Sequence, residues 1–205
     1  MSLIAWMILC GVCLAGAMSP GPSLAVVVQS SLSSGRRAGV IVAISHGAGI
    51  FIWAMLTAGG VGLVLAGWPE VYGLLRLMGS LFLVYLGIRN FKSSTNSGEP
   101  DLLEHGPTIR PLIDGFLIAI TNPKIALFFL ALFSQFVRID ADLSEKVLMA
   151  ATAAIIDALW YSAVALLLSN SKLTNHLVRK KRTIDRIFGV ILISLAISIW
   201  VAEFS

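Results

Sequence analysis

Two short motifs rich in proline each interrupt a long apolar stretch of this 205-residue sequence. The first spans Ser19–Pro22 and the second spans Thr121–Lys124. Proline removes a backbone donor and clashes with the preceding helical turn, so each motif predicts a break inside a helix. The helix that restarts after each break has free N–H groups and a partial positive charge at its N-terminus, which attract anions. With the Lys124 ammonium added, the two breaks predict a cradle for a carboxylate.

A simple kink is the alternative interpretation of each motif. A lone proline in a membrane helix favours that alternative, because kinks of this kind are common. Two breaks at matching places in two halves of a chain favour a binding site near the middle of the membrane. Ser19, Thr121 and Asn122 then either cap the half-helices or contact the substrate.

Asp157 is the second position that could do chemistry, because it lies in the apolar run Ala153–Trp160. A charge at mid-membrane costs about 3 kcal/mol or more, so it normally faces a partner or a cavity. Asp157 could bind a substrate ammonium, carry a proton, or do both. The structural alternative is an ion pair with Lys124 or Arg76.

His46 lies in the second long apolar run, where an imidazole could relay protons near neutral pH. A neutral histidine packed with one hydrogen bond is the alternative. His46 and Asp157 supply only two intramembrane ligands, so the sequence predicts no metal site and no cofactor. The predicted substrate-binding residues are Ser19, Pro20, Gly21, Pro22, Thr121, Asn122, Pro123, Lys124 and Asp157, and the predicted proton-coupling residues are Asp157 and His46.

The composition indicates a protein whose outer surface faces lipid. Hydrophobic residues make up 57% of the chain and charged residues only 13%, whereas soluble domains carry about 25% charged residues. The net charge of +4 comes from short Lys and Arg clusters between apolar runs, not from one basic face. The predicted partner is therefore the lipid bilayer, and nucleic acid is not predicted as a partner.

Six runs are long enough to cross a bilayer, which needs about 20 apolar residues in a helix. The predicted fold class is an all-α membrane protein with two inverted three-helix repeats, residues 1–91 and 111–205, joined by a flexible cytoplasmic loop over 92–110. In it, helices one and four are broken at proline. The predicted spans are Leu3–Ser31, Gly39–Ala66, Val71–Phe91, Leu112–Val137, Val147–Ser169 and Ile184–Phe204.

The repeat follows from setting Pro22 against Pro123, which brings the second and fifth apolar runs into approximate register. An odd number of helices in each half inverts the second half in the membrane. Lys and Arg gather in the connections on one side, and the opposite side has only Arg138 and Lys146. The bias predicts both termini outside the cytoplasm. The residues on the basic side are Arg36, Arg37, Arg89, Lys92, Arg110, Lys172, Arg179, Lys180, Lys181, Arg182 and Arg186.

Small residues recur every four positions in two runs and predict close helix packing. The first set is Gly35, Gly39, Ala43 and Gly47, and the second is Ala150, Ala154, Ala158 and Ser162. Cys10 and Cys13 form a C-x-x-C pattern in the first run. It is interpreted as two small residues of a lipid-phase helix, with a redox pair as the alternative.

In their order and spacing, these motifs resemble the LysE/RhtB family of bacterial amino-acid exporters over essentially the whole chain. The resemblance implies a multi-pass inner-membrane exporter of amino acids or derivatives, driven by the proton gradient. It carries over Pro20, Gly21, Pro22, Asn122, Pro123, Lys124 and Asp157 as site residues, whereas His46 has no place in the usual pattern. The motifs that carry the likeness are Met18–Pro22, Arg36–Gly49, Leu83–Gly87, Thr121–Lys124 and Asp157 with Trp160 and Tyr161.

The sequence therefore predicts a secondary transporter, not an enzyme, with an amino-acid substrate and protons as its small partners. It leaves a homo-oligomer open. Efflux of a divalent metal or another small solute is one alternative function. A membrane thiol–disulfide relay is another, although such a relay would want one cysteine in each half, and both cysteines lie in the first helix.

Overall fold

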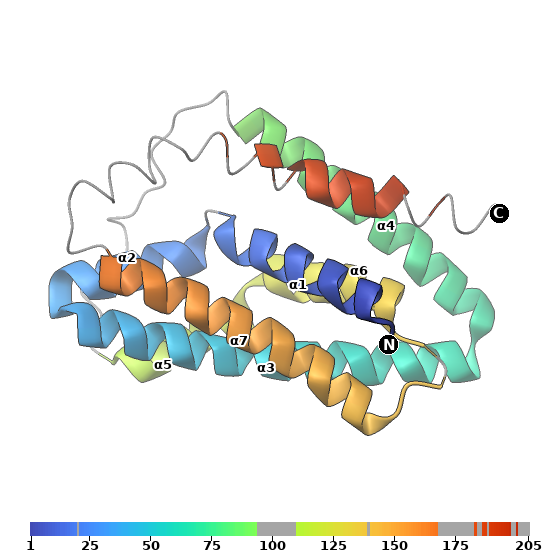
Figure 1. The fold of residues 1–205 in the computed structure, drawn as a ribbon, viewed down its shortest axis with the longest axis horizontal. Coiled ribbons are helices and arrows are strands. Elements are labelled where there is room, and N and C mark those ends of the chain that lie inside the picture. The colour runs from blue at the N-terminus through green and yellow to red at the C-terminus, as the bar shows by residue number, and fades with distance from the viewer. Residues whose placement is uncertain are drawn as a thin grey trace.

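The computed structural model describes residues 1–19, 21–93, 110–138, 140–167, 183, 186–187, 189–197 and 200. All regular secondary structure among these residues is helical, and residues 186–187, 189–197 and 200 near the C-terminus are part of it. The helices with defined bounds are α1 (Leu3–Met18), α2 (Pro22–Ser34), α3 (Arg36–Gly67), α4 (Pro69–Ser93), α5 (Pro111–Thr121), α6 (Pro123–Phe136) and α7 (Leu143–Leu167) (Figure 1).

Three of these helices are each long and apolar enough to cross a membrane, namely α3, residues Glu70–Arg89 of α4, and α7. The pairs α1–α2 and α5–α6 also qualify if each bent pair counts as one span, which gives up to five candidate spans among the described residues. The sixth predicted span, Ile184–Phe204, lies partly outside the described residues. Most of the predicted loop 92–110 and the basic cluster Arg179–Arg182 lie outside them as well.

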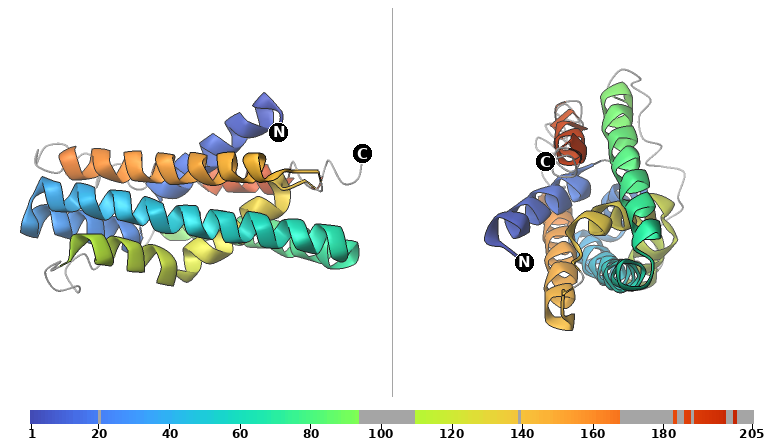
Figure 2. Two further views of the ribbon diagram at one scale, coloured as in Figure 1. Left: turned by 90° about the horizontal axis from the view of Figure 1, so that it is seen from below. Right: turned by 90° about the vertical axis from the view of Figure 1, so that its right-hand side faces the viewer.

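Helices α3 and α7 run side by side along the length of the molecule and share its most extensive interface (Figure 2). Small residues make this approach close: a Cβ atom added to Gly47 would lie 2.9 Å from the Ala158 Cβ, and one added to Gly39 would lie 2.9 Å from the Ala165 Cβ. Later residues of α3 thus meet earlier residues of α7, so the two helices are antiparallel. Gly39, Gly47 and Ala158 belong to the two predicted small-residue stripes, whereas Ala165 lies outside them.

Two further contacts between distant parts of the chain are antiparallel. A Cβ atom on Gly16 of α1 would lie 3.1 Å from the Phe128 ring of α6, while Ser19 contacts Lys124. At the other edge, the Trp200 indole donates to Ser80 Oγ at 2.9 Å, and a Cβ atom on Gly87 would lie 2.7 Å from Ile193. Elements of the second half therefore run opposite to their partners in the first half.

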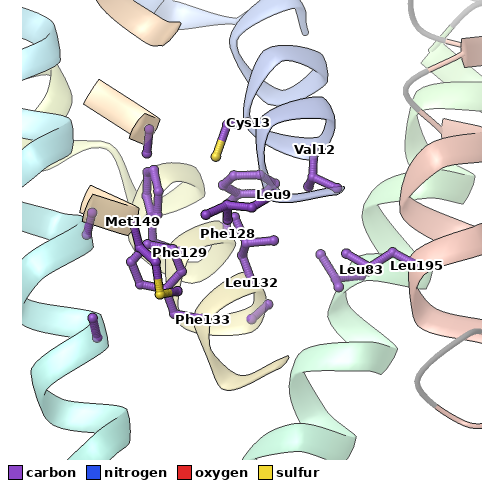
Figure 3. Close-up of a cluster of buried hydrophobic side chains, with 14 of the residues drawn as sticks. Leu9, Val12, Cys13, Leu83, Phe128, Phe129, Leu132, Phe133, Met149 and Leu195 are labelled. Atoms are coloured by element: carbon purple, nitrogen blue, oxygen red, sulfur yellow. The ribbon is translucent and has the colours of Figure 1, made fainter. Parts of the chain in front are cut away.

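A large apolar cluster packs α1 and α6 against α7 and α4 (Figure 3). The rings of Phe128 and Phe129 meet edge to face at 5.5 Å, and Phe129 meets Phe133 at the same distance. Met149 of α7 and Leu9 of α1 are fully buried beside them. This cluster fixes the position of α6 relative to α1, and hence the relative position of the two helix breaks.

Candidate functional site

The first break separates α1 from α2, whose axes differ in direction by 60°. Helix α1 ends at Met18, and Ser19 takes an extended conformation. Gly21 is the N-cap of α2, and Pro22 occupies the first helical position, where its missing N–H is not needed. Pro20 lies outside the described residues. The predicted interruption of the first span is therefore present, and it leaves the N-terminus of α2 inside the helix bundle.

The second break separates α5 from α6 at an angle of 57°. Asn122 caps α6, because its side-chain Oδ1 accepts a hydrogen bond from the Lys124 backbone N–H at 3.0 Å. Pro123 has no N–H to give to the preceding turn. At the end of α5, the indole of Trp53 from α3 donates to the Ile120 carbonyl at 3.2 Å. Backbone groups freed by the break are thus satisfied from within the protein, as a membrane interior requires.

The two breaks face each other although they are far apart in the sequence. The Lys124 ammonium donates a hydrogen bond to Ser19 Oγ at 2.9 Å. A Cβ atom added to Gly21 would lie 3.8 Å from the same ammonium nitrogen. Lys124 thus brings its positive charge to the N-terminus of α2. Thr121 does not join this group: it is exposed, and its hydroxyl donates to the Leu117 carbonyl of its own helix at 2.7 Å.

A chain of three buried polar side chains links α2, α3 and α7. His46 Nδ1 lies 2.6 Å from Asp157 Oδ2, and His46 Nε2 lies 2.8 Å from Ser23 Oγ. The three residues are 1%, 7% and 5% exposed, respectively for His46, Asp157 and Ser23. The Tyr161 ring packs edge-on against the imidazole, with centroids 5.1 Å apart. Two hydrogen bonds on one imidazole can pass a proton or hold it in place, depending on the tautomer.

The ion partner that the structure gives Asp157 is His46. The sequence alternatives named Lys124 and Arg76 for that role. Lys124 instead contacts Ser19, and Arg76 contacts Gln135 of α6, with Nε 3.4 Å from Oε1, and approaches the Tyr72 ring. The sequence did not point to His46 as this partner, because helical periodicity does not say which faces of two helices meet.

Both breaks and the Ser23–His46–Asp157 chain line one cavity of about 60 Å³. Its polar lining comes from the two breaks and from the facing parts of α3 and α7. Its apolar lining comes from α1, α3, α6 and α7. The polar lining residues are Ser19, Ser23, His46, Asn122, Lys124, Asp157 and Tyr161, and the apolar ones include Cys13, Gly16, Ile50, Ile125, Phe128, Phe129 and Ala153.

Sequence reasoning found the breaks and Asp157 but missed Ser23 as a partner of His46 and Tyr161 as a cavity residue. The signal that could have found the His46–Asp157 pair is the register of the small-residue stripes. Gly47 opposes Ala158 across the α3–α7 interface, and each directly neighbours one member of the pair.

The two cysteines are free thiols, with Cys13 buried beside the cavity and Cys10 partly exposed. Within the part of the chain that the structure describes, no group of three or more His, Cys, Asp and Glu residues could hold a metal ion. Asp114 accepts a hydrogen bond from the Arg110 backbone N–H at 3.3 Å and belongs to the first turn of α5, away from the cavity.

Comparison with known proteins gives a consistent family assignment. The sequence model of the LysE type translocator family matches residues 14–203. A threonine efflux protein of Salmonella typhimurium is 22% identical over 91% of this chain and 92% of its own length. Uncharacterised membrane proteins of Escherichia coli (YahN, 24% identical over 85% of this chain and 79% of its own) and Bacillus subtilis (YrhP, 20% identical over 87% and 90%) are similar too. No solved structure matches the chain.

Proposed function

Because the chain belongs to the LysE type translocator family, we propose that it is a secondary active exporter of amino acids or their derivatives, driven by the proton gradient. The family makes it a multi-pass membrane transporter. The amino-acid substrate is supported by the threonine efflux proteins among its relatives. The observation that carries the proposal is the meeting of both helix breaks, Lys124 and the His46–Asp157 pair at one cavity.

We place the protein in the bacterial inner membrane as six spans in two inverted repeats. Three antiparallel contacts support this arrangement: α1 with α6, α3 with α7, and α4 with the helical residues near the C-terminus. Figure 1 gives the same directions, because each element's colour runs from its N-terminal to its C-terminal end. The excess of Lys and Arg in one set of connections puts both termini outside the cytoplasm.

The substrate carboxylate would bind at the first break. The N-terminus of α2 offers backbone N–H groups and the positive end of a helix dipole, and the Lys124 ammonium lies beside it. A charge-assisted hydrogen bond to a carboxylate contributes about 1.5–3 kcal/mol. Ser19 already accepts from Lys124 and keeps that side chain directed into the cavity.

The substrate ammonium and the coupled proton would compete for Asp157. Burying a charged carboxylate costs free energy unless its charge is neutralised. Protonated His46, a proton bound to the carboxylate itself, or the α-ammonium of the substrate could each neutralise it. Binding the ammonium therefore favours loss of the proton, and rebinding a proton favours release of the substrate. This exchange at one carboxylate couples proton entry to amino-acid exit without any cofactor.

Proton-driven transport in proteoliposomes tests the proposal. Vesicles holding the purified protein should transport a labelled amino acid when a pH gradient is imposed. Asp157→Asn should lower the rate by about 100-fold, as expected from loss of a charged interaction of about 3 kcal/mol. Asp157→Glu serves as the control that keeps the carboxylate, and His46→Gln should change the pH dependence of the rate. Full proton-driven transport by Asp157→Asn would remove Asp157 from the mechanism.

A further inference from the structure

The cavity is divided into a polar and an apolar half along the bundle axis. Apolar lining residues lie about one helical turn beyond the polar ones on four elements. Ile50 follows His46 on α3, Phe128 follows Lys124 on α6, and Ala153 precedes Asp157 on α7. Gly16 of α1 precedes Ser19, which directly follows that helix.

These four displacements all point the same way along the bundle. Helix α3 is antiparallel to α7, and α1 is antiparallel to α6, so a later residue on one helix lies level with an earlier residue on its partner. The apolar half therefore lies toward the end of the bundle that holds the chain's N-terminus and the α6–α7 connection (Figure 1).

The apolar half is lined by buried hydrocarbon side chains. Phe129 and Ala153 are 4% and 2% exposed, and the Phe128 ring lies 3.1 Å from the position of a Cβ atom on Gly16. The described side chains lining this half carry no charge, and the Cys13 thiol is the one hydrogen-bond donor among them. A charged or strongly polar group placed here would lose its hydration without gaining a partner.

We infer that the exported amino acid has an uncharged aliphatic side chain, which occupies this apolar half while the ammonium and carboxylate bind at the polar half. The inference rests on the proposed function and specifies the substrate class of the same site. Valine, leucine and isoleucine meet the requirement, whereas lysine and glutamate would bury a charge. Threonine has the shape of valine with a hydroxyl in place of one methyl group, and an apolar pocket rejects such an isostere only by up to about 100-fold.

Efflux from cells fed Ala-Val, Ala-Leu, Ala-Thr, Ala-Lys and Ala-Glu dipeptides tests the inference, with an empty vector and Asp157→Asn as baselines. We expect valine and leucine to leave fastest, threonine about 10- to 100-fold more slowly, and lysine and glutamate at the baseline rate. Export of threonine, lysine or glutamate ahead of valine and leucine would overturn the inference and leave amino-acid export standing. Baseline export of every amino acid would instead contradict the proposed function on which the inference depends.

Two substitutions test whether the apolar half sets this preference. Ala153→Ser adds one hydroxyl to the pocket and should raise the threonine-to-valine export ratio about fivefold, the effect of one new hydrogen bond. Ala151→Ser is the matched control on the same helix outside the cavity and should leave the ratio unchanged. Ile50→Thr, paired with Ile50→Val, repeats the test on the facing helix if Ala153→Ser fails to fold. An unchanged ratio in a folded Ala153→Ser or Ile50→Thr protein would overturn the inference.

Discussion

The two helix breaks have the same general form but satisfy their backbone groups in different ways. At the second break, Asn122 caps α6 with its side chain and the Trp53 indole binds the end of α5. At the first break, Gly21 occupies the N-cap of α2 and has no side chain with which to cap it. Ser23, in the first turn of α2, is hydrogen-bonded to His46.

This difference indicates that the two breaks contribute different groups to the site. The second break holds its own N–H groups and contributes a cation through Lys124. The first break leaves the N-terminus of α2 available to an anionic group and connects it through Ser23 and His46 to Asp157. In the proposed function, the second break would then be the fixed side of the site, and the first would be the side that responds to substrate and proton.

Among substitutions at the two breaks, removing the cation of the second break should have the largest effect. Lys124→Met keeps the length of the side chain but loses its charge, and should lower amino-acid efflux by about 10- to 100-fold, as expected for one charged hydrogen bond. Lys124→Arg should retain more activity, although its planar head differs in shape. Efflux from preloaded cells measures both, and equal rates for Lys124→Met and the unmodified protein would show that transport does not need a cation from the second break.

Cutting the link between the first break and His46 should have a smaller effect. Ser23→Ala removes a neutral hydrogen bond and should lower proton-driven transport about fivefold. Ser33→Ala, at an exposed position of the same helix, is the matched control. The rates are compared in proteoliposomes over a range of pH, where Ser23→Ala should also alter the pH dependence. A uniform loss at every pH would assign Ser23 to packing alone.

Loss of the cap at the second break should act on stability more than on transport. Asn122→Ala removes the acceptor of the Lys124 N–H and should lower the free energy of unfolding by about 1 kcal/mol. Asn122→Ser keeps a side-chain acceptor without adding a charge and should be close to neutral in the same thermal unfolding measurement in detergent. If Asn122→Ala lost all transport with unchanged stability, Asn122 would contact the substrate instead of capping α6.

The smallest effect on stability should come from Gly21→Ala at the first break. Gly21 has an extended backbone with φ of −170°, which alanine also adopts. Among the described residues, the added methyl group would come within 4 Å of the Lys124 ammonium alone, at 3.8 Å. The free energy of unfolding should stay the same or rise by about 0.5 kcal/mol. Transport should fall while stability holds, because the methyl group would lie between α2 and Lys124, where the substrate carboxylate would bind. Unfolding of the Gly21→Ala protein would show a steric demand at this break that the second break lacks.

The positions of the breaks could be predicted from the sequence because proline acts locally. Pro22 and Pro123 each begin a new helix, and the apolar runs around them are helical as expected. Asp157 was also predictable, since a charge inside an apolar run needs a partner wherever it lies. The six-span inverted repeat remains a prediction, because part of the last run lies outside the described residues.

The partner of Asp157 was not predictable in the same way. Composition and periodicity place His46 and Asp157 within apolar helices, but a contact between them depends on how α3 and α7 are rotated and aligned. Ser23 was even harder to find, because serine is common beside a helix start and usually serves as a cap. Thr121 was selected for its position next to a break, but its helical phase turns it away from the cavity.

The fluorescence of the Trp53 indole can report on the second break. Its N–H binds the Ile120 carbonyl at the end of α5, and indole emission shifts when such a hydrogen bond is exchanged for water. A protein retaining Trp53, with the other four tryptophans changed to phenylalanine, would therefore signal through its fluorescence whenever α5 and α3 separate during the transport cycle.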